Sequence, residues 1–481
     1  MLHVETPQSV CNFGLARCDI TPPVGIYHRM WGAATHERAS GVHRPLSATA
    51  VVLQAVQASA APEHEVILLA VDHCLLWAPE MDALLTDVAR QAEVPRETIL
   101  VAFSHTHAAG LMDRSRAHLP GGELIAPYLD DLATKLAAIT RQARGSLQRA
   151  TIAYTTGRCA LAAHRDFFDE GSRQIVCGFN PLGSGDDTVL VGLVTGGEGQ
   201  VLATLVNYAC HPTTLAWENT LISPDFPGAM RDVVEAATGA PCVFLQGASG
   251  DLGPREGFVG DTAVADRNGR QLAHAVLAAL EALPPAGTRF EYTGPVVSGA
   301  TLGSWAHRPL EAPRLEAQTQ WRLRRWTLPL PYRADLPDLE RMRTERAHWL
   351  AEEQAAQQAG DTVKARDCHA QVERRDRQLV RLAVLPAGKE FPLPLALWQM
   401  GDACWFAVEA EHYQYLQRTI RGRFPRMPIF VLTIVNGSRP SYLPTADAYG
   451  KGIYQETVAV LAPGCLEQVV EGVSKQIAAW V

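Results

Sequence analysis

The chain has 481 residues, of which 47% are hydrophobic and 20% are charged, and its formal net charge is -8. This composition is typical of a globular protein with one very large core or two ordinary ones. The mild negative charge and the absence of a dense lysine and arginine cluster argue against a surface for nucleic acid, so we expect no nucleic-acid partner.

The N-terminus and the cysteines indicate where the protein works. Residues 1–6 have neither the basic start nor the apolar stretch of a signal peptide, and no segment reaches the roughly 20 apolar residues of a membrane span. The ten cysteines are scattered and form no C-x-x-C pair, which favours reduced thiols that pack as small apolar groups. We therefore expect a cytoplasmic protein without stable membrane association.

Apolar runs of strand length alternate with amphipathic helical stretches from residue 12 to about 290. The predicted elements are, in chain order, strand 66–71, helix 81–92, strand 99–103, helix 127–144, strand 201–210, helix 229–237, strand 243–246 and helix 263–283. This alternation is typical of an α/β protein. We expect a large mixed sheet flanked by helices, in a single domain that spans residues 1–481.

Residues 335–380 break this pattern. The segment is dense in glutamate, arginine, glutamine and alanine, and it predicts two helices separated at Gly360-Asp361. We expect a helical hairpin inserted into the domain. One interpretation is a solvated hairpin. The other, favoured by apolar positions such as Trp349 and Leu350, is a lid over the site or an arm that forms a homo-oligomer.

Three histidines follow two of the predicted strands. His105 and His107 lie in a Ser-His-Thr-His segment directly after strand 99–103, and His211 follows strand 201–210. Residues two apart in an extended backbone point the same way, so His105 and His107 are expected to converge, one binding a metal and the other handling protons. Imidazoles from scattered positions suit a catalytic zinc site. The alternative is that these histidines are hydrogen-bonded turn or core residues.

Two further segments place acidic residues at strand ends. The run 242–254 predicts a strand followed by a loop of small residues, in which backbone amides can approach an anionic or tetrahedral species. Asp251 in this loop is placed to orient a histidine or to accept a proton, although a simple turn is the alternative. The β-hairpin predicted at 395–408 delivers Glu409 and Glu411 at its end.

The ordered set of these segments resembles the neutral/alkaline ceramidase family, a group of zinc-dependent amide hydrolases. The similarity covers nearly the whole chain and includes segments 16–23, 41–46, 104–107, 207–213, 223–225, 250–254 and 442–445, followed by Tyr449 and Tyr454. The resemblance implies a zinc ion held by His105, His211, Glu411 and Tyr442. Glu409 is a rival ligand to Glu411, because the family usually has Pro-Gly-Glu where this chain has Glu409-Ala410-Glu411.

The resemblance also implies the roles of the catalytic residues. His107 is expected to shuttle a proton toward the leaving group, and Arg165 or Tyr454 to stabilise the developing oxyanion, with Asp251 as the remaining catalytic candidate. For Arg165, the alternative is a surface salt bridge. A zinc-bound hydroxide would serve as the nucleophile.

Two departures from the family pattern limit the expected substrate. Gly253 occupies the position at which ceramidases carry a serine tied to activity, and we expect the chain to lack their C-terminal immunoglobulin-like domain. We therefore expect hydrolysis of an amide, lactam, ester or lactone in a soluble small molecule instead of ceramide in a bilayer. The alternatives are a zinc-dependent isomerase or lyase acting on a polar metabolite, and a non-catalytic ligand-binding protein.

Overall fold

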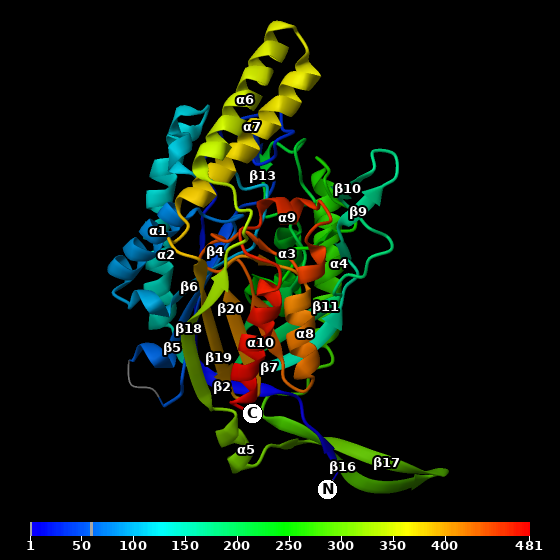
Figure 1. Cartoon of the computed structure of the whole chain (residues 1–481). Helices are drawn as coiled ribbons and strands as arrows, with labels where there is room; N and C mark the ends of the chain where they lie inside the picture. Colours follow the sequence, from blue (N-terminus) through cyan, green and yellow to red (C-terminus); the bar gives the residue numbers. More distant parts are fainter. Residues whose placement is uncertain (1, 58–60) are drawn as a thin grey trace.

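The computed structural model describes residues 2–57 and 61–481. An eight-stranded mixed sheet forms the centre of the molecule (Figure 1), with strand order β14-β12-β11-β7-β2-β4-β5-β6. Its strands are β2 (Gln8–Asp19), β4 (Ser47–Gln54), β5 (Glu65–Val71), β6 (Ile99–Phe103), β7 (Gln148–Arg158), β11 (Thr188–Gly196), β12 (Val201–Tyr208) and β14 (Cys242–Gln246). This sheet and the helices that flank it confirm the predicted α/β class.

Each edge of the large sheet is a parallel pair joined by a crossover helix, as parallel strands require. Helix α1 (Ala78–Ala92) joins β5 to β6, and α3 (Phe226–Thr238) joins β12 to β14. Every neighbouring pair from β12 to β5 is antiparallel. Because β6 is parallel to β5, it runs in the opposite direction to β12. A twist of about 20–25° per strand accumulates to roughly 120–150° over the six steps between them. The twist therefore turns the ends of β6 and β12 toward each other.

A second sheet of four strands packs against the large one. Its order is β18-β19-β20-β22, and its strands are β18 (Trp321–Pro331), β19 (Glu390–Met400), β20 (Ala403–Val408) and β22 (Ile429–Leu432). Trp398, Trp405 and Phe430 are buried in the core between the two sheets, where the rings of Trp405 and Phe430 stack at 4.1 Å. Residues just beyond β22 form hydrogen bonds with both edge strands of the large sheet. Thr433 N donates to Gln246 O of β14, and Asn436 N donates to Val101 O of β6.

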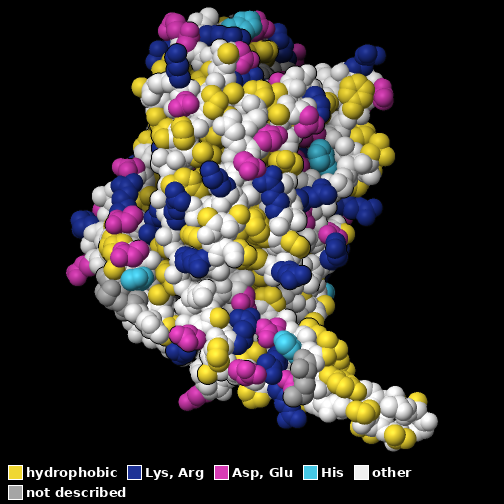
Figure 2. All heavy atoms as spheres, turned by 60° about the horizontal axis from the view of Figure 1, so that its bottom comes forward, with side chains coloured by type: hydrophobic (Ala, Val, Ile, Leu, Met, Phe, Trp, Pro, Cys, Tyr) yellow, Lys and Arg dark blue, Asp and Glu magenta, His cyan; other side chains and the backbone are white. Residues whose placement is uncertain are grey.

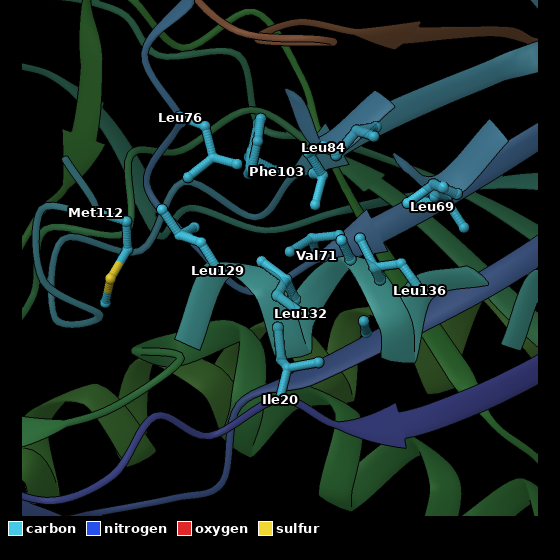
Figure 3. Close-up of a cluster of buried hydrophobic side chains, with 14 of the residues drawn as sticks. Ile20, Leu69, Val71, Leu76, Leu84, Phe103, Met112, Leu129, Leu132 and Leu136 are labelled. Carbon is cyan, nitrogen blue, oxygen red and sulfur yellow. The ribbon is translucent and has the colours of Figure 1, made fainter. Parts of the chain in front are cut away.

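Helices cover the outer faces of both sheets. Helices α1 and α2 (Ile125–Gly145) pack on the half of the large sheet that contains β5 and β6, and Figure 3 shows Leu129, Leu132 and Leu136 of α2 in this core with Val71 of β5. Helices α3 and α4 (Thr262–Leu280) cover the other half, whereas α8 (Tyr415–Arg423) and α10 (Cys465–Ala478) cover the second sheet. Each buried leucine contributes about 1.5–3 kcal/mol, so both histidine-bearing strands rest on a rigid core.

Two hairpins project from opposite ends of the molecule (Figure 1). One is helical and consists of α6 (Leu339–Gln358) and α7 (Thr362–Ala383). Gly360 has a left-handed backbone and lies between the helices, and Asp361 caps α7 by accepting from Lys364 N, so the predicted break lies where the structure has it. The other is the ribbon of β16 (Thr288–Ser298) and β17 (Ala300–Pro309), which pairs with β1 (His3–Val4) and bears exposed hydrophobic side chains (Figure 2).

Short elements lie at the carboxyl ends of the strands. Three two-stranded pairs join distant segments: β3 (Gly41–Val42) with β13 (Leu221–Ile222), β8 (Ala162–His164) with β15 (Leu252–Pro254), and β21 (Glu411–His412) with β23 (Tyr442–Leu443). The remaining elements are β9 (Asp166–Asp169), β10 (Gln174–Cys177), α5 (Ala312–Ala317), α9 (Tyr454–Val458) and short 3-10 turns at Pro62–His64, Arg96–Thr98, Arg114–His118, Gly122–Leu124 and Ala446–Ala448.

The predicted elements agree with the structure except at their ends. Strand 99–103 matches β6 at both ends, helix 127–144 lies within α2, and strand 201–210 stops two residues early, at Tyr208. Among the described residues, no helix combines the length and the apolar character needed to cross a membrane. The prediction of a single domain and that of a homo-oligomer through residues 335–380 stay predictions.

Candidate active site

Four polar side chains converge at the carboxyl ends of the strands. The Nε2 atoms of His105 and His211 lie 3.1 Å apart, and Glu411 Oε2 is 3.3 Å from the first and 3.1 Å from the second. Tyr442 Oη lies 3.3 Å from His211 Nε2. All four side chains are buried. The four residues predicted as metal ligands therefore meet at one point, although they come from three distant parts of the chain.

The extended backbone predicted for His105 and His107 is wrong. Strand β6 ends at Phe103, and His105 has a left-handed backbone with φ of 68°, so the segment from His105 to His107 is not extended. The turn is held by His105 N, which donates to His73 O. The imidazole rings of His105 and His107 nevertheless lie 4.9 Å apart.

Left-handed residues cluster around the candidate ligands. Besides His105, Ala410 (φ 84°) directly precedes Glu411, and Ser441 (φ 62°) directly precedes Tyr442. Such a conformation costs a residue other than glycine about 1–3 kcal/mol and is typical of functional sites. The parallel pairing of β21 with β23 then places Glu411 opposite Tyr442.

Backbone carbonyl groups fix the orientation and the neutral tautomer of both histidines. His105 Nδ1 donates to the carbonyl oxygen of Cys74, and His211 Nδ1 donates to that of Ser249, each at 2.7 Å. A neutral imidazole that donates through Nδ1 carries its lone pair on Nε2. The Nε2 atoms of both histidines and the oxygen of Glu411 therefore face one another, an arrangement that requires a cation, either a proton or a metal ion, between them.

The donor set fits zinc. Zinc binds imidazole nitrogen and carboxylate oxygen at about 2.0–2.2 Å, and ligands of a tetrahedral ion at that distance lie about 3.3 Å apart. The distances of 3.1 to 3.3 Å among the donors of His105, His211 and Glu411 agree with this value. The carbonyl groups of Cys74 and Ser249 accept the outer hydrogen bonds that metal-bound histidines make.

The pKa values of His211 and Glu411 keep these two donors available for a metal. Burial, aided by Arg165, lowers the pKa of His211 to about 4, so this imidazole stays neutral. Burial raises the pKa of Glu411, but His105 and His211 outweigh it and hold that pKa well below its ordinary value. Glu411 is therefore a carboxylate at neutral pH. Burial lowers the pKa of His105, but Cys74 and Glu411 outweigh it and hold that pKa well above its ordinary value, so a metal would displace a proton from this imidazole.

Glu409 points away from this cluster. Its carboxylate accepts from Arg439 Nε at 3.0 Å and from the backbone nitrogen of Arg439 at 2.9 Å. Glu411, two residues later, is the glutamate that contacts the histidines. Of the two rivals, only Glu411 is placed to bind a metal there.

His107 lies beside the four donors without joining them. Its ring is 5.9 Å from that of His211 and 5.2 Å from that of Trp31. Its buried Nε2 atom has no hydrogen-bond partner among the described residues. Burial, together with His105 and His211, lowers the pKa of His107 well below its ordinary value. A neutral imidazole with a free nitrogen can accept a proton from a bound molecule.

Arg165 and Tyr454 both contact the ring of Tyr442. The Arg165 guanidinium lies 5.3 Å from the Tyr442 ring and donates to the carbonyl oxygen of Gly250 at 2.7 Å. Arg165 is only 3% exposed, so the alternative of a surface salt bridge is wrong. Tyr454 begins α9, and its half-exposed ring lies 5.9 Å from the Tyr442 ring.

Asp251 is the predicted site residue that the structure does not bring to the cluster. Its carboxylate accepts from the backbone nitrogen of Gln414 at 2.7 Å and from Gln414 Nε2 at 2.9 Å, and the nearest histidine nitrogen that it faces belongs to His164, at 3.9 Å. It lines a separate polar cavity of about 680 Å³. The prediction that Asp251 orients a site histidine is therefore wrong for His105, His107 and His211. Its carbonyl oxygen instead accepts from Arg165 N.

An aromatic wall beside His107 was missed from the sequence. Trp31 packs on His107, and its ring lies 6.3 Å from Trp217 and 5.6 Å from Phe258. Trp217 is 37% exposed, so the wall extends from the half-buried His107 to the surface. These aromatics come from three separate loops, and no spacing in the sequence indicates that they meet.

The Gly253 position has room for a side chain. A Cβ atom built there would lie 3.8 Å from Thr213 Oγ1 and 4.0 Å from Arg165 Cβ, and the backbone is not left-handed. We expect Gly253→Ser to fold with a melting temperature within a few degrees of the wild type and to keep its activity within roughly threefold. Circular dichroism and a rate measurement check this. Activity that arises only in the serine variant would show that the natural glycine disables the site.

Comparison with known proteins adds a relationship of fold. The chain is an α/β protein with a His-His-Glu-Tyr cluster at converging strand ends. No protein-family model and no curated protein sequence matches it. Among solved structures, it is similar to the neutral ceramidase from Pseudomonas aeruginosa, at 14% identity and a TM-score of 0.63, over 98% of this chain and 74% of that one.

A second solved structure gives the same result. A ceramidase complexed with C2 superposes with a TM-score of 0.64 at 13% identity, over 97% of this chain and 74% of that one. The chain therefore has the fold of neutral ceramidases, and the resemblance seen in the sequence is confirmed at that level.

Proposed function

We propose that this protein is a zinc-dependent hydrolase that cleaves an amide or related acyl bond in a soluble small molecule. The observation that carries the proposal is the arrangement of His105, His211 and Glu411, whose side-chain ligand atoms lie within 3.3 Å of one another. The similarity in fold to neutral ceramidases supports it, because the same fold holds an amide hydrolase there. An amide is therefore the first bond to test, and lactam, ester and lactone are the related alternatives.

The candidate ligands His105, His211, Glu411 and Tyr442 would hold the zinc. Zinc in such a site polarises a carbonyl group and lowers the pKa of a bound water to about 7. The residues of the chain then have to bind the substrate, orient it and move protons. Hydrolysis adds the oxygen of water to the carbonyl carbon, breaks the bond to the leaving group and transfers a proton to that group.

His107 is suited to proton transfer, and Arg165 is suited to stabilising the charge of the transition state. The free Nε2 atom of His107 accepts a proton from the attacking water and returns it to the leaving nitrogen. Arg165 is buried beside Tyr442, where its positive charge stabilises the negative charge that develops on the carbonyl oxygen. Tyr454, at the exposed side of Tyr442, is placed to donate a further hydrogen bond to a substrate.

The aromatic wall favours a substrate with an apolar part. Trp31, Trp217 and Phe258 present ring surface between His107 and the solvent, which suits an acyl chain or an aromatic group. We also propose that the protein works in a reducing compartment such as the cytoplasm, because all ten cysteines are free thiols.

A substrate screen with matched metal controls tests this function. The zinc-loaded protein is incubated with short N-acyl amides, lactams, lactones and esters, and with ceramide in vesicles. We expect hydrolysis of at least one soluble acyl compound, loss of that activity with a chelator and recovery with zinc. Cleavage of ceramide in vesicles without cleavage of any soluble compound would contradict the proposed substrate class.

The two glutamates provide a matched pair of variants. We expect Glu411→Gln to lower zinc affinity by at least about 10-fold, because it removes a charged donor from the cluster. Glu409→Gln should keep zinc but lower the stability by about 1–3 kcal/mol, since it breaks a buried pair whose partner, Arg439, is partly exposed. Zinc titration and thermal melting separate the two effects. Loss of zinc from Glu409→Gln alone would reverse the assignment.

A further inference from the structure

Helix α7 presents one line of side chains to the body of the protein. Ala370, Arg374, Arg377 and Arg381 are spaced by four, three and four residues, which places them on one face of the helix. We call these four residues the inner stripe. Three of the four carry a guanidinium group, so this face of α7 is strongly cationic.

The inner stripe lies against the wall of the candidate active site. Arg377 donates to the carbonyl oxygen of Met30, and a Cβ atom at Gly32 would lie 2.8 Å from Ala370 Cβ. Between these two contacts lies Trp31, whose ring packs 5.2 Å from that of His107. The helix is therefore docked directly over the segment that forms the first part of the aromatic wall.

A buried ion pair fixes the helix in this position. Glu373, next to the inner stripe, accepts from Arg116 at 3.1 Å, and both side chains are buried. Arg116 also donates to Tyr27 Oη at 2.9 Å. Because the pair joins α7 to the body of the protein, the inner stripe is held in place over the site.

Two arginines of the inner stripe have no acidic partner among the described residues. Arg381 lies 5.8 Å from the Trp77 ring and donates to Gln378, but its buried Nε atom is without a partner and it forms no ion pair. Arg374 is exposed and makes no hydrogen bond or ion pair with a described residue. By contrast, Arg377 has a partner, because it donates a hydrogen bond to the carbonyl oxygen of Met30.

Both arginines lie on the side of the site where Tyr442 and Tyr454 lie. Burial lowers the pKa of Arg381, while Tyr454, Glu411 and Tyr442 act in the opposite direction. The protein atoms packed around Arg374 likewise lower its pKa, and Tyr454 opposes this effect. The carboxylates among these neighbours are Glu411 and, beside Arg374, Glu345. Both are already committed, Glu411 to the histidines and Glu345 to Arg341 and Arg375.

The charge balance of this region calls for an anion. An unpaired cation that is partly buried costs free energy unless a ligand supplies the opposite charge. Arg165 packs on Tyr442, and Tyr454 is a neighbour of both Arg374 and Arg381, whereas Glu411 and Glu345 are already paired. Guanidinium groups bind carboxylate and phosphate groups through paired hydrogen bonds. The aromatic wall beside His107 consists of the uncharged rings of Trp31, Trp217 and Phe258.

We propose that Arg374 and Arg381 bind an oxyanion, a carboxylate or a phosphate, on the leaving-group side of the substrate, while its apolar acyl group lies on the aromatic wall. The substrate class is therefore an N-acyl compound whose amine part is anionic. This inference rests on the proposed function, because it assigns both ends of the molecule that the site would cleave. Arg374 and Arg381 would position the substrate, and His107 and Arg165 would remain the reacting groups.

Binding of uncleavable probes tests the anion site separately from catalysis. The probes are ketone analogues of N-octanoylglycine, with a methylene in place of the amide nitrogen, in three forms: the carboxylate, the corresponding phosphonate and the neutral primary amide. Calorimetry on the zinc-loaded protein should give at least ~10-fold tighter binding for one anionic probe than for the neutral one, since a hydrogen bond between two charged groups is stronger than one to a neutral amide. Equal affinities for all three probes would overturn the proposal.

Two variants and a control from the same helix assign the effect to the inner stripe. Arg374→Gln, at an exposed position, and Arg381→Gln should each weaken binding of the anionic probe by roughly 10-fold. Neither variant should change the affinity for the neutral probe. Arg366→Gln removes an exposed α7 arginine that is paired with Asp367, and it should change neither affinity. Thermal melting checks folding, and Arg381→Lys should restore part of the preference for an anion. An undiminished preference in Arg374→Gln and in a folded Arg381→Gln would exclude the inner stripe.

Hydrolysis assays distinguish a failure of this inference from a failure of the proposed function. N-octanoylglycine is compared with its neutral amide, N-octanoylglycinamide, under the same conditions. Anion-selective binding without hydrolysis of either compound would support the anion site and count against the hydrolase. Equal hydrolysis of both compounds would support the hydrolase and overturn the anion site.

Discussion

His105→Ala and His211→Ala should each remove most of the bound zinc, which we expect at about one ion per chain in the purified protein. Each imidazole supplies an Nε2 lone pair whose direction is fixed by a carbonyl group, that of Cys74 for His105 and that of Ser249 for His211. Removal of one donor leaves too few ligands for a tetrahedral ion. Elemental analysis of the purified variants measures the loss.

The control for this experiment is a histidine far from the cluster. His307 lies exposed on the ribbon of β16 and β17, and His307→Ala should retain full zinc. Thermal melting of all three variants shows whether zinc was lost because the protein unfolded. Full metal content in both His105→Ala and His211→Ala would contradict the assignment of the metal site.

His107→Ala should keep its zinc and lose at least ~100-fold in turnover, the usual effect of removing a general acid or base. The imidazole of His107 lies close to the cluster, but its buried Nε2 atom has no partner among the described residues, so it is free to exchange a proton with the substrate. Turnover and zinc content are measured on the same preparation.

The matched variant for His107 is His105→Ala, two residues away. If His107→Ala lost its zinc while His105→Ala retained it, the two histidines would have opposite roles. A His107→Ala protein with unchanged turnover would reduce His107 to a packing partner of Trp31.

Most of the fold could be predicted from local patterns in the sequence. The apolar runs that became β6 and β14 and the amphipathic stretch that became α2 each carry their own period, so the elements were placed to within a few residues. The strand order could not be predicted in this way. It depends on the twist of eight strands and on the hydrogen bonds of Thr433 and Asn436, which join residues far apart in the chain.

The sequence predicted the parts of the candidate site in which the residue type itself indicates the chemistry. It did not predict the parts that depend on how distant segments meet in the fold. His105 and His211 were predicted because imidazole groups after strands indicate a metal site, and the family resemblance added Glu411 and Tyr442. The sequence did not indicate that Asp251 lies away from the cluster, because its partner, Gln414, comes from a distant segment, and its catalytic role stays a prediction. The carbonyl groups that orient the histidines belong to Cys74 and Ser249, and a backbone group leaves no signal in a sequence.

Zinc-dependent amide hydrolysis is the central claim, and one assay tests it directly. N-octanoylglycine and N-octanoylglycinamide are incubated with the purified protein as isolated, after removal of metal by a chelator and after zinc is restored, with His105→Ala alongside. We expect release of octanoate by the isolated and the restored protein, and at least ~100-fold less by the chelated protein and by His105→Ala. Octanoate release that persists unchanged after metal removal, or its absence from protein that holds one zinc per chain, would contradict the account.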